Sequence, residues 1–265
     1  MSERHHNPNR WMVRRELLKL AVTGGCAVGG LLAGSNLLAG TRALPRAEQS
    51  PDLESGSEQY ASGDKKISAY FAKPKSGTKL PAILVVQDST PFAGFEGAAR
   101  HFATQGFAVL APDLGSTEAG KSIEGLSPSD TVDDLKAGYD YLSQHANVDS
   151  ARVSVAGFGW GGWRAWMIAE QTQNLHRAVV FDVISPTDGL EEIQAPVLAH
   201  YAQFDYTDVS NAVWTHKTLE AAGKKFTYYV YPKTSKGFYL EGTSSYDPDA
   251  AKLVWQRTLE FLASS

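Results

Sequence analysis

The feature that most constrains the fold is a stretch from Arg152 to Trp166, which reads Arg-Val-Ser-Val-Ala-Gly-Phe-Gly-Trp-Gly-Gly-Trp-Arg-Ala-Trp. Its first part contains β-branched residues and favours a short strand, whereas its last part favours a helix. The glycines between the two parts indicate a sharp turn that leads directly from the strand into the helix. A strand followed at once by a helix is the building unit of sheets whose strands run parallel.

The same alternation of strands and helices continues along the chain. Apolar runs of strand length occupy residues 67–72, 81–87, 107–111, 177–181, 196–201 and 226–231. Apolar stripes with helical spacing lie at residues 95–103, 132–142, 209–219 and 253–262. The alternating run at 67–72 predicts an edge strand, while the continuous runs are typical of strands buried on both faces. The chain therefore predicts an α/β fold, with a mostly parallel sheet covered by helices on both faces.

The boundaries of this domain follow from composition. The absence of an internal repeat or a second hydrophobic pattern predicts one domain over residues 63–265. Residues 44–62 are rich in Pro, Ser and Gly and predict a flexible spacer. Residues 1–43 have the composition of an export signal and are left out of the expected fold.

The signal has three recognisable parts. A basic start that includes Arg14-Arg15 precedes an apolar run from Leu20 to Ala39, and Thr41-Arg42-Ala43 fits a small-x-small cleavage site. The paired arginines resemble a twin-arginine signal, so we expect the twin-arginine export machinery as a partner and a periplasmic or extracellular location. Two alternatives stay open: a general secretory signal, or an uncleaved membrane anchor, since the apolar run is about as long as a bilayer requires.

Charge and cysteine content narrow the classes of partner and cofactor. The net charge of the whole chain is −4, and residues 1–43 hold six Lys/Arg and two Asp/Glu, which leaves −8 for residues 44–265. An acidic body argues against nucleic acid or an anionic membrane as the main partner. The single cysteine, Cys26, lies in the signal, which excludes a disulfide or a cysteine-based metal site in the folded domain. No His/Asp/Glu spacing suggests zinc, and we expect no cofactor.

The glycine-rich turn also fits a catalytic motif. The pattern Gly-x-Nuc-x-Gly, a strained turn on which hydrolases present a Ser or Cys nucleophile, falls on residues 157–161. Gly159 holds the nucleophile's position and has no side chain to attack with. Glycine tolerates the positive φ of that position without the penalty that other residues bear. The sequence therefore predicts that the turn is kept and the attacking atom is missing.

Several stretches together resemble the dienelactone hydrolase family, whose members hydrolyse ester and lactone bonds through a Cys (sometimes Ser), an Asp and a His. They are Tyr70-Phe-Ala-Lys-Pro, Ile83-Leu-Val-Val-Gln, Ala111-Pro-Asp-Leu, Gly157-Phe-Gly-Trp-Gly-Gly, the strand that ends at Asp205 and the strand followed by Lys236-Gly-Phe. The resemblance covers roughly residues 65–262 and implies an α/β-hydrolase fold with activity on a small ester or lactone.

The resemblance also implies site positions. It places the nucleophile on Gly159, the acid on Asp205 and the base on Lys236, where the family has His. Lysine has an ordinary pKa of about 10.4 and stays protonated unless burial lowers that pKa by several units. A neighbouring Asp205 would instead stabilise the ammonium, and an Asp205–Lys236 ion pair is the favoured interpretation. Conventional acyl-enzyme catalysis is therefore not expected.

Further positions concern the oxyanion hole and the pocket. The family's acidic residue after the first buried strand falls on Asp88, and backbone N–H groups at Trp160 and near Asp88 and Ser89 would form the oxyanion hole. Trp160 is also the favoured pocket residue, whereas Trp163 and Trp166 are expected to pack against the sheet.

Three functions stay open at this point. The chain is a hydrolase of the family with a degenerate triad, a non-catalytic extracytoplasmic protein that binds a small carboxylate, or an atypical hydrolase in which Asp88 or Lys236 activates water directly.

Overall fold

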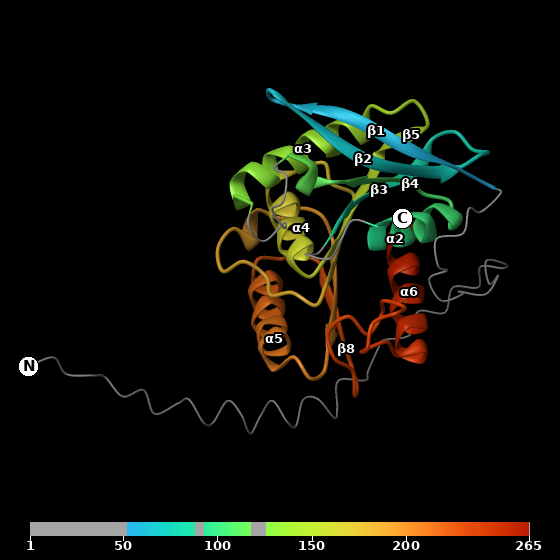
Figure 1. Cartoon of the computed structure of the whole chain (residues 1–265). Coiled ribbons are helices and arrows are strands. Elements are labelled where there is room, and N and C mark those ends of the chain that lie inside the picture. The colour runs from blue at the N-terminus through green and yellow to red at the C-terminus, as the bar shows by residue number, and fades with distance from the viewer. Residues whose placement is uncertain (1–51, 88–92, 118–125, 265) are drawn as a thin grey trace, which may run out of the picture. The chain divides into compact units, whose positions relative to one another are not determined.

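The computed structural model describes residues 52–87, 93–117 and 126–264 (Figure 1). Within these residues eight strands form one sheet in the order β1-β2-β4-β3-β5-β6-β7-β8. The strands are β1 (Leu53–Ser62), β2 (Lys65–Pro74), β3 (Leu80–Val86), β4 (Ala108–Pro112), β5 (Val148–Phe158), β6 (Ala178–Phe181), β7 (Val197–Ala202) and β8 (Phe226–Tyr231). Strands β3 to β8 pair parallel with one another, while β2 pairs antiparallel with both β1 and β4. The predicted mostly parallel sheet is confirmed.

Helices cover both faces of the sheet. One face carries α3 (Pro128–Ser143), α4 (Trp160–Gln171) and α5 (Tyr206–Ala221), and the other carries α2 (Ala93–Thr104) and α6 (Pro248–Ala263) (Figure 1). Two short 3₁₀ segments, Leu114–Thr117 and Leu190–Glu192, lie in the connections. None of the helices in the described parts of the chain is long and apolar enough to span a membrane.

The core consists of two apolar layers, one on each face of the sheet. Strand β3 shows why its apolar run is continuous: Leu84 packs into the layer under α3 and α4, while Ile83 and Val85 pack into the layer under α2 and α6. A strand with helices on both faces buries every side chain, so no polar alternation is needed. Trp166 is fully buried in the first layer, as predicted, whereas Trp163 is only partly buried.

The predicted spacer over residues 44–62 is wrong for residues 53–62, which form β1. This strand pairs with β2 along its whole length, from Leu53 with Pro74 to Ser62 with Lys65. Most of its Ser, Gly and Glu residues are exposed because an edge strand meets solvent, while Tyr60 is buried and donates a hydrogen bond to the Asp134 carbonyl. The sheet thus begins ten residues before the predicted boundary at residue 63.

Strand β2 is correspondingly not the edge strand that its alternation predicts, because β1 covers its outer side and β4 its inner side. The predicted export signal, the start of the spacer, and Asp88 and Ser89 lie outside the described residues.

Candidate active site

The turn between β5 and α4 has the geometry of a nucleophile elbow. Gly159 has φ 51° and ψ −120°, a backbone conformation that side-chain-bearing residues adopt only under strain. Its N–H donates to the Phe181 carbonyl at 2.9 Å, and its own carbonyl accepts from the Gly162 N–H at 2.9 Å. A Cβ at Gly161 would collide with the backbone oxygens of Val86 and Gln87. Glycine therefore permits both the conformation and the close approach of α4 to the end of β3.

An ion cluster lies where the acid and the base of such a site would stand. The Lys236 ammonium, in the loop after β8, is 3.0 Å from Asp205 Oδ2 and 3.1 Å from Asp208 Oδ2. Asp205 is the N-cap of α5, and its Oδ1 accepts from the Asp208 N–H at 3.0 Å. The predicted pair of Asp205 and Lys236 is therefore present. Asp208 was not predicted, although an acid in the first turn of a helix is a recognisable signal.

This cluster keeps Lys236 protonated. Burial lowers the pKa of Lys236, but the two carboxylates outweigh burial and raise that pKa above its ordinary value. Burial raises the pKa of Asp205, but the Asp208 N–H and the Lys236 ammonium outweigh it, so that the pKa of Asp205 lies below its usual range. The pKa of Asp208 is raised by burial. A protonated ammonium cannot accept a proton from a nucleophile.

A third carboxylate, Asp182, fastens the loops of this region. It directly follows β6, has φ 49°, and is almost fully buried. Its Oδ1 accepts from the Ala202 N–H and its Oδ2 from the Gly237 N–H, both at 2.9 Å. Burial raises the pKa of Asp182 to about 7. The sequence signal for Asp182 was an acid immediately after a buried strand.

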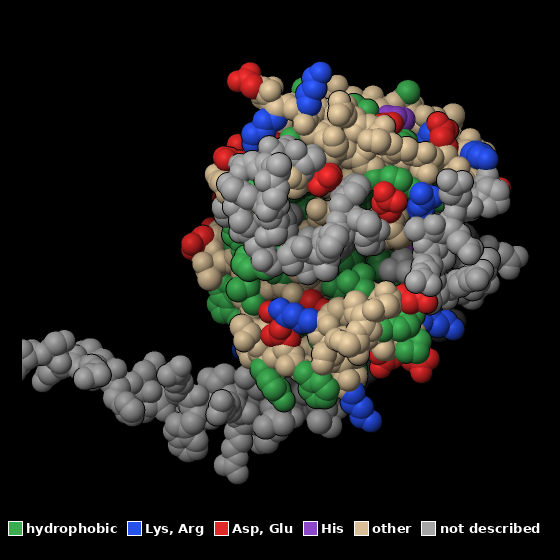
Figure 2. All heavy atoms as spheres, viewed as in Figure 1, with side chains coloured by type: hydrophobic (Ala, Val, Ile, Leu, Met, Phe, Trp, Pro, Cys, Tyr) green, Lys and Arg blue, Asp and Glu red, His purple; other side chains and the backbone are tan. Residues whose placement is uncertain are grey.

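These contacts place the predicted positions on one edge of the sheet. Gly159 is bonded to Phe181, the next residue Asp182 is bonded to Gly237, and Gly237 adjoins Lys236. The carboxyl ends of β5 to β8 thus bring Gly159, Asp205 and Lys236 into one region. Figure 2 shows a face of the molecule on which acidic and basic side chains meet beside exposed hydrophobic ones.

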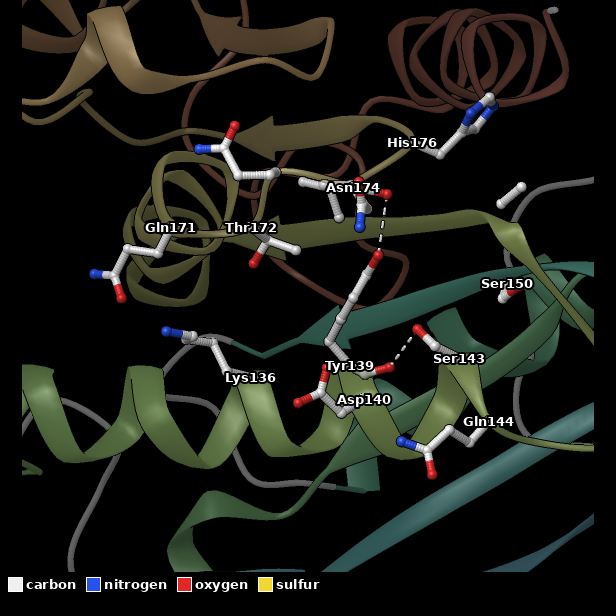
Figure 3. Close-up of a pocket in the computed structure, with 13 residues that line it drawn as sticks. Lys136, Tyr139, Asp140, Ser143, Gln144, Ser150, Gln171, Thr172, Asn174 and His176 are labelled. Carbon is white, nitrogen blue, oxygen red and sulfur yellow. Dashed lines mark hydrogen bonds between the residues drawn. The ribbon is translucent and has the colours of Figure 1, made fainter.

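A surface hollow in the described residues lies away from this edge of the sheet. It has a volume of about 790 Å³ and lies between α3 and the segment that follows α4 (Figure 3). Tyr139 donates to the Asn174 carbonyl at 3.0 Å inside it, and Ser143 donates to the Tyr139 carbonyl at 2.7 Å. The hollow includes Gln171, the last residue of α4, which a helix of this length places about 18 Å from Gly159. The hydroxyls of Tyr139 and Ser143 are occupied by these bonds, and the hollow lies away from the elbow, so it is not the candidate site.

Two buried histidines belong to the core rather than to a catalytic set. His200 is hydrogen bonded through Nδ1 to the Tyr231 hydroxyl at 2.9 Å and through Nε2 to Thr258 at 3.0 Å. Burial lowers the pKa of His200 to about 3 and that of His101 to about 4. Among the residues that the structure describes, no group of His, Cys, Asp and Glu is arranged to hold a metal ion.

The sheet is mostly parallel and has helices on both faces. An elbow follows β5, and charged residues follow β7 and β8. Together these features define an α/β-hydrolase fold. The sequence identifies the family within it. The model of the dienelactone hydrolase family matches residues 67–265, and the chain belongs to that family.

Curated and solved relatives agree with this family. A protein of Salmonella typhi with the provisional name carboxymethylenebutenolidase is 28% identical over 248 residues, which cover 83% of this chain and 91% of the relative. A Bradyrhizobium protein provisionally named 2-oxo-3-(5-oxofuran-2-ylidene)propanoate lactonase is 27% identical, covering 73% of this chain and 88% of its own. The fold also matches a provisionally named dienelactone hydrolase from Klebsiella pneumoniae, with a TM-score of 0.74, 24% identity, and coverage of 80% and 99%.

Proposed function

We propose that this chain is an exported protein that binds a small molecule in the cleft of a dienelactone hydrolase without forming an acyl-enzyme. The observation that carries the proposal is the environment of Lys236, the residue at the expected position of the base. Its ammonium lies 3.0 Å from Asp205 and 3.1 Å from Asp208, and the elbow carries Gly159 in place of a nucleophile. Acyl transfer by this family's chemistry needs an attacking atom and a group that takes its proton. This chain supplies neither at the two positions.

A hydrolase that activates water through Lys236 is not favoured. The raised pKa of Lys236 leaves it without a free electron pair at neutral pH. Asp182 has a pKa of about 7, which suits a general base, but both of its oxygens accept backbone N–H groups and its side chain is buried away from solvent. Asp88 lies outside the described residues.

The ligand class follows from the same contacts. Members of the family act on esters and lactones, and a small carboxylate is the ligand expected for a non-catalytic binding protein. A carboxylate would have to compete with Asp205 and Asp208 for an ammonium that both already contact. The geometry therefore favours a ligand that does not depend on Lys236 as its counter-ion.

Location is part of the proposal. The basic start with Arg14-Arg15 and the apolar run that follows support export by the twin-arginine machinery, with the periplasm or the extracellular space as the site of action.

The direct test compares hydrolysis of aryl esters and lactones by the wild type and by the double variant Gly159→Cys plus Lys236→His. We expect no turnover by the wild type above the uncatalysed rate. The double variant should gain turnover, because it restores a thiol and a base at the two positions that the resemblance to the family implies.

The matched control for added thiol is Gly242→Cys. Gly242 also has a positive φ, 89°, and a Cβ there would meet no atom within 4 Å. This variant should show only background thiolysis. Turnover by the wild type that Asp205→Ala abolishes would contradict the proposal.

A further inference from the structure

The edge of the sheet that carries Gly159 and Lys236 is unusually rich in exposed aromatic residues. Trp160 is 53% exposed, Phe204 54% and Tyr206 76%, and Ile184 nearby is 40% exposed. Of the six large hydrophobic residues that are exposed in the described parts of the chain, four follow β5, β6 and β7 at this edge. Large apolar side chains that gather on an exposed surface mark a binding site. We call Trp160, Ile184, Phe204 and Tyr206 the aromatic edge.

The loops that carry the aromatic edge adjoin one another. Val183 packs against the first turn of α4, since a Cβ at Gly162 would lie 2.6 Å from its Cγ1. This contact brings the segment with Ile184 next to the helix that begins at Trp160. On the other side, the Phe204 N–H donates to the Thr234 carbonyl at 3.1 Å, in the loop that continues to Lys236. The four loops after β5 to β8 thus form one surface.

The charge beside the aromatic edge favours a cation. Asp205 and Asp208 share the single ammonium of Lys236 within this cluster, so their two carboxylates outnumber its one positive charge. Residues 44–265 as a whole carry a net charge of −8. Aromatic ring faces attract cations, and an acidic surface raises the local concentration of cations while repelling anions.

We propose that the aromatic edge binds an organic cation that carries apolar substituents, such as a quaternary ammonium group. Trp160, Phe204 and Tyr206 supply ring faces to the cation, and Ile184 supplies apolar contact to its substituents. The carboxylates of Asp205 and Asp208 supply a negative electrostatic potential. The inference rests on the proposed function, because it gives the ligand class of the same non-catalytic cleft. It departs from the small carboxylate expected from the sequence.

The test is isothermal titration calorimetry of the full chain with three compounds of matched shape: choline, 3,3-dimethylbutan-1-ol and 3,3-dimethylbutanoate. The alcohol replaces the quaternary nitrogen of choline by carbon and so removes only the charge. We expect choline to bind about two- to fivefold more tightly than the alcohol, which is the range of a cation–aromatic contact near a surface. The carboxylate should bind most weakly.

Variants locate the site. Trp160→Ala and Phe204→Ala should each weaken choline binding, whereas Trp214→Ala, which removes a 40% exposed aromatic side chain two turns further along α5, should leave it unchanged. Lys236→Met should strengthen choline binding, because it removes the one cation of the cluster.

Each outcome decides the matter. The cation proposal would be overturned if the alcohol or the carboxylate bound as tightly as choline or more tightly, or if choline did not bind detectably. Either result would leave the proposed lack of acyl-enzyme chemistry unaffected. Ester turnover by the wild type would overturn the proposed function, while the order of affinities among the three compounds would still be read independently.

Discussion

At the scale of single residues, Lys236 determines the charge and protonation of the site, at a position where the resemblance to the family implies a histidine. A histidine there would titrate near neutral pH and could exchange a proton. The lysine instead forms ion pairs with two carboxylates, one of which, Asp208, has a side chain only 5% exposed. Such a buried carboxylate depends on its partner, because an unpaired buried charge is costly.

This dependence gives a prediction for Lys236→Met. Without its partner Asp208 should have a still higher pKa in the folded state, while its unfolded value stays near 3.8. A group whose folded pKa is raised loses stability as pH rises from the unfolded pKa through the folded pKa. We expect the variant to lose about 1–3 kcal/mol of unfolding free energy at pH 7 and less at pH 5, measured by urea denaturation.

Lys233→Met is the matched control for this prediction. Lys233 lies in the same loop, is exposed, and also has a positive φ, 61°. Its replacement should cost little at either pH. A loss for Lys236→Met that is equal at both pH values would show that Asp208 does not depend on the ammonium.

At the scale of elements, the carboxyl ends of β6, β7 and β8 are joined through the Asp182 side chain. Each of its oxygens accepts one backbone N–H, from Ala202 and from Gly237, at 2.9 Å. The loop with Lys236 is therefore held in place by a residue on another strand.

Removal of this carboxylate should loosen both loops. In Asp182→Ala the N–H groups of Ala202 and Gly237 lose their acceptors, so we expect faster amide hydrogen exchange at these two residues. The midpoint of thermal unfolding should also fall, since orphaned buried N–H groups cost about 1–3 kcal/mol each. Asp188→Ala, which changes an exposed acid in the loop after β6, should affect neither measurement. Unchanged exchange at Gly237 would refute the fastening role.

The sequence predicts the elements whose signal is local and misses contacts that join distant strands. The apolar runs of β3 and β8 and the turn at Gly159 follow from residues that lie together in the chain. Strand β1 is missed because an edge strand can consist almost wholly of polar residues when its partner supplies the hydrogen bonds. The contacts of Asp182 and Asp208 are missed because their partners lie tens of residues away.

At the scale of the whole molecule, buried histidines make stability depend on pH. His101 and His200 have pKa values of about 4 and 3 in the folded protein, below the 6.5 of a free histidine, because burial disfavours their charged form. The unfolded chain therefore binds more protons below pH 6.5, and stability falls as pH falls from 6.5 toward 4. Asp182 acts in the opposite sense, since its raised pKa makes stability fall as pH rises from 3.8 to about 7.

A variant of His101 isolates one of these contributions. The Nε2 of His101 has no hydrogen-bond partner and its ring packs 4.8 Å from the ring of Trp255, so His101→Phe keeps the packing without breaking a bond. We expect the decline in stability between pH 6.5 and 4 to become shallower by up to about 1.4 kcal/mol per pH unit, measured by urea denaturation across that range. An unaltered slope in His101→Phe would contradict the assigned proton uptake.

The central claim, that this hydrolase fold does not form an acyl-enzyme, is tested most directly by intact-mass spectrometry after mixing the protein with an activated aryl ester. The wild type should keep its unmodified mass, whereas Gly159→Cys should gain one acyl group that maps to residue 159. An acyl adduct on the wild type that forms within the first turnover and disappears on hydrolysis would contradict the claim.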